Sequence, residues 1–167
     1  SSASAAIVGH YNDTTLVATS AHVCSMRFGR QINDFIPHFD AKNPNWHFME
    51  RPTFILNDLK GRTTVGVVLS LDYASHLCMM VSKKIPMPVI EISKHDPIIG
   101  EKYYNIAAPR GIWGPNVVPL LEGRFLGNTK SPFTGDPSYM FTIPASGGSS
   151  GSPIINAYGD LVALLHS

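Results

Sequence analysis

Residues 146–156 read SGGSSGSPIIN, a Gly- and Ser-rich turn that runs directly into an apolar strand. Ser150 has a glycine two positions before it and another directly after it. A nucleophilic serine needs this setting, because its hydroxyl must project from a tight turn while neighbouring backbone N–H groups converge to hold an oxyanion. Ordinary hairpin loops share this composition. Ser150 is therefore a candidate nucleophile, and a second motif has to decide between the two interpretations.

That second motif lies near the N-terminus, where residues 15–24 read TLVATSAHVC. His22 follows an apolar strand directly. A general base for a serine hydroxyl must titrate near neutral pH, and the imidazole side chain does so. Taken alone, a histidine here is more often structural. The order of His22 and then Ser150 along the chain nevertheless fits a base and its nucleophile.

The rest of the chain alternates between short apolar runs and turn residues. The runs are β-branched and aromatic, as strands prefer, and a short helix is expected only near Ser20. The expected strands cover residues 5–10, 15–19, 53–56, 63–69, 77–81, 102–107, 117–121, 139–143, 153–155 and 161–165, and the expected long loops cover residues 28–46 and 128–138. About ten short strands separated by turns predict an all-β barrel or sandwich.

Composition excludes several classes of function. Hydrophobic residues make up 44% of the 167 residues and charged residues 15%, a balance typical of a folded domain. Lys and Arg number 13 against 12 Asp and Glu, so no basic excess favours nucleic acid. No apolar run reaches the ~20 residues of a membrane span. The N-terminus has neither Met nor a signal-peptide pattern, which suggests an excised or processed product. No paired metal-ligand spacing occurs, so we expect no metal and no cofactor.

The chain has two cysteines, Cys24 and Cys78. Two thiols can form one bridge, but they do not make the disulfide framework of a small secreted domain. Unpaired cysteines are usually buried, so we expect two half-buried free thiols.

Together these motifs resemble the chymotrypsin-fold (trypsin-like) serine proteases. Within that family the likeness is to short bacterial and viral members, namely HtrA-type proteases, glutamyl endopeptidases and viral polyprotein-processing proteases. Their pattern is an apolar strand ending in T-x-x-H and, later, G-x-S-G-[GS]-P before another apolar strand. Residues 97–111 (PIIGEKYYNIAAPRG) are similar to the opening of the family's second barrel, and residues 120–127 (LLEGRFLG) to its next strand. The resemblance covers nearly the whole chain.

The resemblance implies a single protease domain, residues 1–167, of two six-stranded-type antiparallel β-barrels that stops short of the family's last strands. Residues 1–85 would form the barrel that carries the base, and residues 98–167 the barrel that carries the nucleophile. Ser150 would be the nucleophile, His22 the base, and the N–H groups of Gly148 and Ser150 the oxyanion hole. The partner would be a polypeptide substrate, with the chain's own polyprotein as one candidate.

The third member of the triad is where the sequence departs from the family. The family orients its histidine with an aspartate just before an apolar strand. The best gapless match here places His76 at that position, while Asp72 lies four residues earlier. Only one of them can bond the same imidazole nitrogen. We therefore expect His76, with Asp72 as the alternative and a catalytic dyad as a third possibility.

Two further departures concern specificity and activation. Pro144 and Ala145 stand where the family often sets the floor of its specificity pocket, so a preference for Lys or Arg is not expected. In some relatives a histidine near the position of His166 recognises a Glu or Gln side chain of the substrate. His166 is offset from that family position by one residue. Ser149 replaces the aspartate that pairs with a new N-terminus in digestive members, so no such activation is expected. The alternatives are a pseudoprotease acting as a binding or scaffold module, and an esterase using the same serine.

Overall fold

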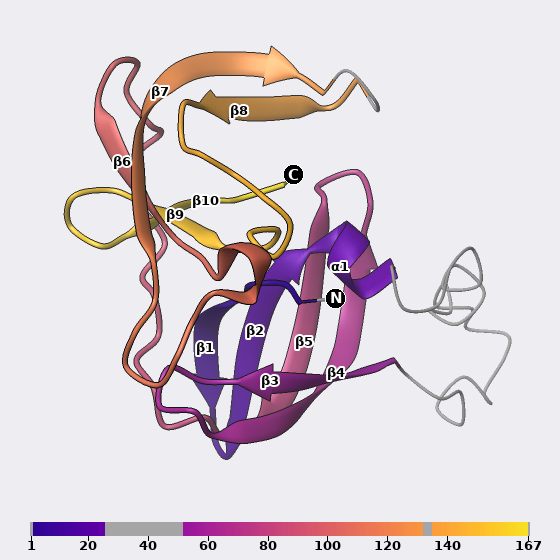
Figure 1. Cartoon of the computed structure of the whole chain (residues 1–167). Coiled ribbons are helices and arrows are strands. Elements are labelled where there is room, and N and C mark those ends of the chain that lie inside the picture. Colours follow the sequence, from indigo (N-terminus) through magenta and orange to yellow (C-terminus); the bar gives the residue numbers. More distant parts are fainter. Residues whose placement is uncertain (1, 26–51, 132–134, 167) are drawn as a thin grey trace, which may run out of the picture.

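The computed structural model describes residues 2–25, 52–131 and 135–166. The first sheet is antiparallel, with strand order β1-β2-β5-β4-β3. It is drawn in indigo and magenta in Figure 1. Its elements are β1 (Ala6–Tyr11), β2 (Thr14–Ser20), β3 (Thr53–Asn57), β4 (Thr63–Asp72) and β5 (Leu77–Lys83), and the short helix α1 (Ala21–Ser25) follows β2.

The second sheet is built from the C-terminal half of the chain, with strand order β10-β9-β6-β7-β8. Its strands are β6 (Lys102–Ile106), β7 (Leu120–Lys130), β8 (Pro137–Phe141), β9 (Pro153–Ile155) and β10 (Leu161–Leu164). Figure 1 shows it above the first sheet, with the C-terminal end of the chain between the two sheets and the N-terminal end beside α1. The ends of β2 and β9, which flank the two motifs, are thereby brought toward the same region.

Each sheet has its own apolar core. In β5 the side chains alternate between buried and partly buried positions, the period expected of a strand with one face against a core. Val17, Val68 and Met80 form the centre of the first core. Tyr103 and Phe125 lie in the second, with their rings edge to face at 6.4 Å. Each of the two motifs is thus carried by a part of the chain with its own packed core.

The predicted all-β architecture is confirmed, with ten strands among the described residues and the short helix after Ser20. Among the described residues each sheet has five strands, where six had been expected. The loop expected at residues 128–138 is wrong in its extent, because β7 continues to Lys130 and β8 already begins at Pro137. Cross-strand pairing of β7 with β8 overrides the local turn preference there. The expected loop 28–46 lies outside the described residues.

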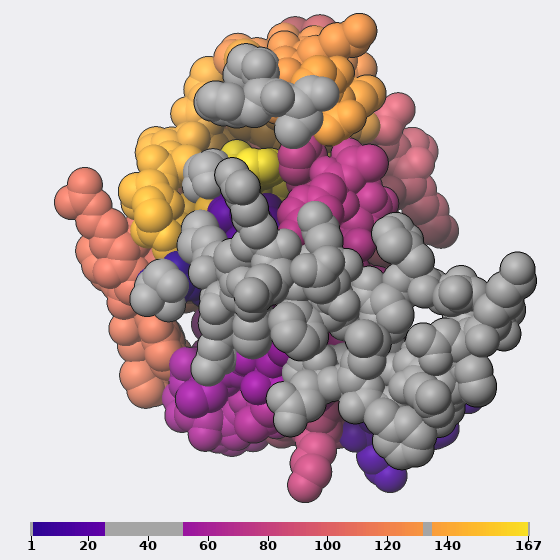
Figure 2. Space-filling view, turned by 90° about the vertical axis from the view of Figure 1, so that its right-hand side faces the viewer, coloured from indigo at the N-terminus to yellow at the C-terminus, as the bar shows by residue number. Residues whose placement is uncertain are grey.

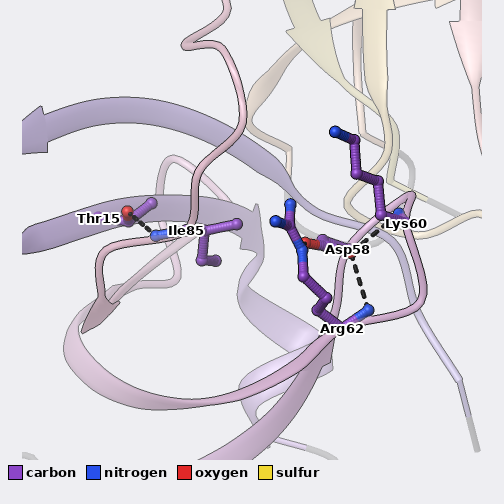
Figure 3. A network of polar contacts seen from close by, with 5 residues as sticks. All are labelled: Thr15, Asp58, Lys60, Arg62 and Ile85. Atoms are coloured by element: carbon purple, nitrogen blue, oxygen red, sulfur yellow. Dashed lines mark hydrogen bonds and ion pairs between the residues drawn. The ribbon is translucent and has the colours of Figure 1, made fainter.

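Side-chain oxygen atoms accept hydrogen bonds from backbone N–H groups in one turn and at the start of the segment between the two sheets (Figure 3). Oδ1 of Asp58 accepts hydrogen bonds from the backbone N–H groups of Lys60 and Arg62, both at 2.9 Å, and thereby closes the β3–β4 turn. The buried hydroxyl of Thr15 accepts from the N–H of Ile85 at 2.8 Å. This bond fixes the start of the segment that leads to the second sheet.

The two cysteines are bonded to one another, so the expectation of free thiols is wrong. Cys24 in α1 and Cys78 in β5 form a disulfide with a Cα–Cα distance of 6.5 Å. The pairing of β2 with β5 places Thr19 opposite Cys78, and α1 returns Cys24 over that position. The general burial of unpaired cysteines carries no information about this long-range pairing. Within the described residues, no helix has the length and apolar character needed to cross a bilayer.

Candidate active site

Ser150 lies in a buried turn between two glycines with positive φ. Gly148 has φ +92° and Gly151 has φ +81°. A Cβ at Gly148 would lie 2.5 Å from the carbonyl oxygen of Ala108, and one at Gly151 would collide with the Thr19 hydroxyl. Both glycines are thus required by backbone conformation and by close packing. The contact at Gly151 sets the turn directly against the end of β2.

Hydrogen bonds fix the orientation of the peptide planes in this turn. The carbonyl of Gly147 accepts from the N–H of Arg110 at 2.5 Å, and the carbonyl of Ser149 accepts from the N–H of Ser152 at 3.0 Å. In a planar trans peptide the C=O and the following N–H point in opposite directions. The N–H groups of Gly148 and Ser150 therefore point away from these two partners.

His22 lies in α1, directly after β2, and its ring is held by a near neighbour. Nδ1 is 2.8 Å from the hydroxyl oxygen of Ser20, which is itself buried. Nε2 is buried and has no hydrogen-bond partner among the described residues. One nitrogen is thus anchored, and the other is available to exchange a proton with a bound group.

Two more histidine rings pack beside His22. The His166 ring centroid lies 4.9 Å from that of His22 and 4.4 Å from that of His76. Leu165 positions His166 against the serine turn, because its carbonyl accepts from the N–H of Gly151 at 2.8 Å and its N–H donates to the carbonyl of Ser152 at 2.9 Å. In Figure 2 the yellow C-terminal segment lies between the orange second sheet and the magenta and indigo first sheet. The imidazole cluster and the serine turn therefore share one neighbourhood.

Burial and repulsion lower the pKa of two of these rings. Desolvation is the main cause that lowers the pKa of His22 below 6.5, and the nearby His166 and His76 lower it further. Desolvation and His76 likewise lower the pKa of His166. A positive charge on a neighbouring ring makes protonation of His22 less favourable, so the neutral form of His22 is favoured.

The two residues considered as third triad members occupy different environments. The backbone carbonyl of His76 accepts from the N–H of Ala21 at 2.9 Å, and its Nε2 lies 3.7 Å from a carboxylate oxygen of Asp136. Asp72 is exposed. Its carboxylate accepts from the N–H of Ala74 at 3.0 Å and from the hydroxyl of Ser75 at 2.7 Å. Asp72 thus caps its own turn between β4 and β5.

The residues expected to line the specificity pocket are not brought together by any described contact. Pro144 and Ala145 are exposed at the start of the segment after β8. The ring contacts of His166 run to His22 and His76.

Three neighbours of the site escaped the sequence interpretation. Ser20, two residues before His22, is the partner of Nδ1, and its position beside the histidine was an available signal. Asp136, directly before β8 of the second sheet, lies close to His76, and Ser4 bonds to the serine turn. Neither of these two contacts has a local sequence signal, because each depends on how the sheets meet.

The described part of the chain contains no group of three or more histidine, cysteine or acidic side chains arranged to hold a metal ion. His10, outside the cluster, has a structural role. Its Nδ1 lies 2.9 Å from the hydroxyl of Thr15, and its Nε2 lies 2.7 Å from the carbonyl of Met87.

Two facing antiparallel β-sheets, with a histidine after β2 and a serine turn before β9, define a chymotrypsin-like peptidase fold. Residues 3–164 match the family model of the trypsin-like peptidase domain, and the chain belongs to that family.

Solved structures support the same fold. The serine endoprotease from Yersinia pestis aligns with a TM-score of 0.65 and 15% identity, over 97% of this chain and 47% of that one. The Rv3671c protease in its inactive form aligns with a TM-score of 0.63 and 16% identity, over 97% of this chain and 70% of that one. This chain thus spans about half the length of the Yersinia structure. No curated protein sequence gives a significant match.

Proposed function

We propose that this protein is a serine endopeptidase in which Ser150 is the nucleophile and His22 the general base. The observation that carries the proposal is the state of the His22 ring. Its Nδ1 is anchored at 2.8 Å by Ser20, and its Nε2 is buried and unpartnered among the described residues. The serine turn packs against Thr19, three residues before His22. A base needs one free ring nitrogen facing its proton donor.

The reaction proceeds through an acyl-enzyme. Nε2 of His22 takes the proton of the Ser150 hydroxyl as Oγ bonds to the substrate carbonyl carbon, and the carbonyl oxygen becomes an oxyanion. When the tetrahedral intermediate collapses, the C–N bond breaks and His22 gives its proton to the departing amine. His22 then takes a proton from water as the water oxygen bonds to the ester carbon. When this second tetrahedral intermediate collapses, the bond to Oγ breaks, His22 returns the proton to Oγ of Ser150, and the peptide acid leaves. Atoms and charge balance without a cofactor.

The N–H groups of Gly148 and Ser150 are proposed to bind the oxyanion. The bonds from Arg110 and Ser152 hold the preceding carbonyls, so these two N–H groups are oriented before the substrate arrives. Donors fixed in advance stabilise developing charge without reorganisation, and each contributes about 3 kcal/mol to the barrier reduction.

We propose Ser20 as the direct partner of Nδ1, with His76 as the third imidazole of the site. His76 acts electrostatically through its proximity to the His22–His166 pair, beside the carboxylate of Asp136. The turn contacts of Asp72 favour His76 over this alternative. A hydroxyl orients the base but stabilises an imidazolium less than a carboxylate does.

For specificity we propose a substrate preference other than Lys or Arg, with Pro144 and Ala145 at the pocket floor and His166 at its edge.

Residues 1–85 are proposed to form the base-carrying half and residues 98–167 the nucleophile-carrying half of one protease domain. The partner is a polypeptide, and a viral polyprotein containing this chain is the specific candidate that the family resemblance raises. A scan of peptide cleavage by the purified protein tests the proposed substrate preference and the polypeptide partner.

The alternative function is a catalytically weakened pseudoprotease that acts as a binding or scaffold module. One observation favours it, namely that the Nδ1 partner of His22 is a hydroxyl instead of a carboxylate.

Labelling with a fluorophosphonate probe separates the two functions, because the probe reacts only with an activated serine. We expect the wild-type protein and the exposed-site control Ser2→Ala to be labelled, and Ser150→Ala to be unlabelled. A folded wild-type sample that takes up no probe, or labelling that persists in Ser150→Ala, would overturn the peptidase proposal.

A further inference from the structure

Ser4, ahead of the first strand, makes four hydrogen bonds that join the two halves of the molecule. Its hydroxyl donates to the carbonyl of Gly148 at 2.9 Å and accepts from the N–H of Ala108 at 3.1 Å. Its own N–H donates to the carbonyl of Ser150 at 3.0 Å, and its carbonyl accepts from the hydroxyl of Thr19 at 2.8 Å. Three of these bonds reach the second half of the chain, and one reaches β2.

Two of these bonds act on the peptide planes around the nucleophile. The Gly148–Ser149 plane is held from both sides, by Ser4 at its carbonyl and by Ser146, whose carbonyl accepts from the N–H of Ser149 at 2.9 Å. The carbonyl of Ser150 is likewise bonded to Ser4. The residues whose N–H groups are proposed to bind the oxyanion thus have their carbonyls fixed by a single residue.

The turn needs such support because its own side chains supply little. Gly148 and Gly151 have no side chain, and glycine loses the most conformational freedom when it is held in place. The Ser149 hydroxyl is fully buried and has no hydrogen-bond partner among the described residues. Besides the backbone bonds within the turn, its orientation therefore depends on contacts from outside it, and Ser4 supplies two of these from a distant part of the chain.

From this geometry we infer that Ser4 is a positioning residue that holds the nucleophile turn in its oxyanion-binding conformation. The inference rests on the proposed function for its catalytic consequence, but the structural support is independent of it. The segment ahead of β1 acts as an internal strut, made of the same chain, between Thr19 of the first sheet and the turn of the second. Ser4 acts through Gly148 and Ser150 and does not contact the substrate.

The matched pair of variants is Ser4→Ala and Ser2→Ala, which remove one hydroxyl each from the same segment. Ser2 is exposed, whereas the Ser4 hydroxyl bonds to Gly148 and Ala108. We expect Ser4→Ala to reduce the second-order rate of fluorophosphonate labelling about tenfold, the effect of an oxyanion donor weakened without being lost. Ser2→Ala should label at the wild-type rate. Ser4→Thr, which keeps the hydroxyl, should recover most of the rate.

A second readout does not depend on activity. Amide hydrogen exchange at Ser149 and Ser152 should accelerate in Ser4→Ala and stay at the wild-type level in Ser2→Ala, because the turn loses a constraint in the first variant only. Unchanged exchange at both amides in folded Ser4→Ala would overturn the inference, even for a protein that takes up no probe. Wild-type exchange and wild-type labelling together would overturn it as well. Thr19→Val removes the fourth bond from the other sheet, and faster exchange in that variant supports the strut.

Discussion

The hydroxyl oxygen of Ser20, the last residue of β2, lies 2.8 Å from Nδ1 of His22 in the following helix α1. A hydroxyl can accept from Nδ1–H and so select the tautomer whose Nε2 is unprotonated. It carries no charge, so it steadies the ring without neutralising the imidazolium of the proposed reaction. This arrangement predicts a slower base than one paired with a carboxylate.

Removing that hydroxyl should slow proton transfer. We expect Ser20→Ala to reduce the fluorophosphonate labelling rate about tenfold, since a hydrogen bond to a charged group contributes roughly 1.5–3 kcal/mol. Affinity for the probe should change little, because Ser20 is buried beneath His22. The measurement is a concentration series that separates the maximal labelling rate from half-saturation.

Ser25→Ala is the control for Ser20→Ala. The Ser25 hydroxyl donates to the backbone carbonyl of His22 at 2.9 Å and does not bond to the imidazole. Equal losses of rate in the two variants would show that α1 is merely destabilised, and would remove Ser20 from the positioning role.

The pH dependence of labelling reports the pKa of the base. His22 must be neutral to accept a proton, and its pKa is held below 6.5 by burial first and then by His166 and His76. In a plot of labelling rate against pH, the midpoint of the acidic limb should therefore lie below pH 6.5. His166→Gln removes one of these neighbours, so the pKa of His22 should rise and the limb should move to higher pH.

Other charged groups also face the imidazole cluster, so the shift expected in His166→Gln needs a control variant. Asp136 lies beside His76, and Asp72 lies at the start of the β4–β5 turn that contains His76, so two carboxylates also face the cluster. Substitution of the distant histidine, His95→Gln, should leave the limb unchanged. A limb that stays in place in His166→Gln would contradict the proposed coupling.

Stability should also fall in acid. The folded-state pKa of both His22 and His166 lies below 6.5, so between 6.5 and the lower folded values the unfolded chain binds more protons. The free energy of unfolding should therefore decrease as pH falls below about 6.5, and this contribution is fully present at higher pH. Urea unfolding at several pH values, with His166→Gln for comparison, measures it. If the free energy of unfolding changes with pH equally in the two proteins, His166 does not contribute to the loss of stability in acid.

Asn105 should matter for the strand that follows the nucleophile. Its fully buried amide nitrogen donates to the hydroxyl of Ser152 at 2.7 Å and to the carbonyl of Pro153 at 2.9 Å. We expect Asn105→Ala to lower the free energy of unfolding by about 2 kcal/mol, the sum of two lost bonds. Asn57→Ala, at an exposed position in β3, should cost far less, and similar costs would contradict the assignment.

Sequence reasoning found the elements whose signals are local. The glycines around Ser150 and the apolar strand before His22 identify the two motifs, because each requires residues close together in the chain. The contacts of Ser4 with Gly148 and of Asp136 with His76 could not be found in this way. Each joins residues far apart in sequence, through the way two separately packed sheets meet.

The same distinction explains two of the corrected expectations, the extent of the loop at residues 128–138 and the free thiols. Residues 128–130 have a turn-like composition, but pairing with β8 keeps them in β7. Cys24 and Cys78 pair because β2 and β5 are neighbours, a fact that strand order supplies and spacing does not.

Loss of the disulfide should weaken the first half of the molecule. The bridge joins residues 54 positions apart, and its removal should cost about 4 kcal/mol if the unfolded chain gains the corresponding loop entropy. We expect Cys24→Ser/Cys78→Ser to unfold at lower urea concentration than the wild type. Wild-type protein measured in a reducing agent should behave like the double variant. No change in the midpoint would contradict the bridge.

The Cys24–Cys78 bond also makes a covalent ring of everything between its ends, including β3 and β4. A nick at any peptide bond in that interval leaves one molecule, whose pieces separate on a gel only after reduction. Cleavage there, whether by this protein or by another protease, would open the backbone without releasing the segment that carries His22 from the one that carries His76.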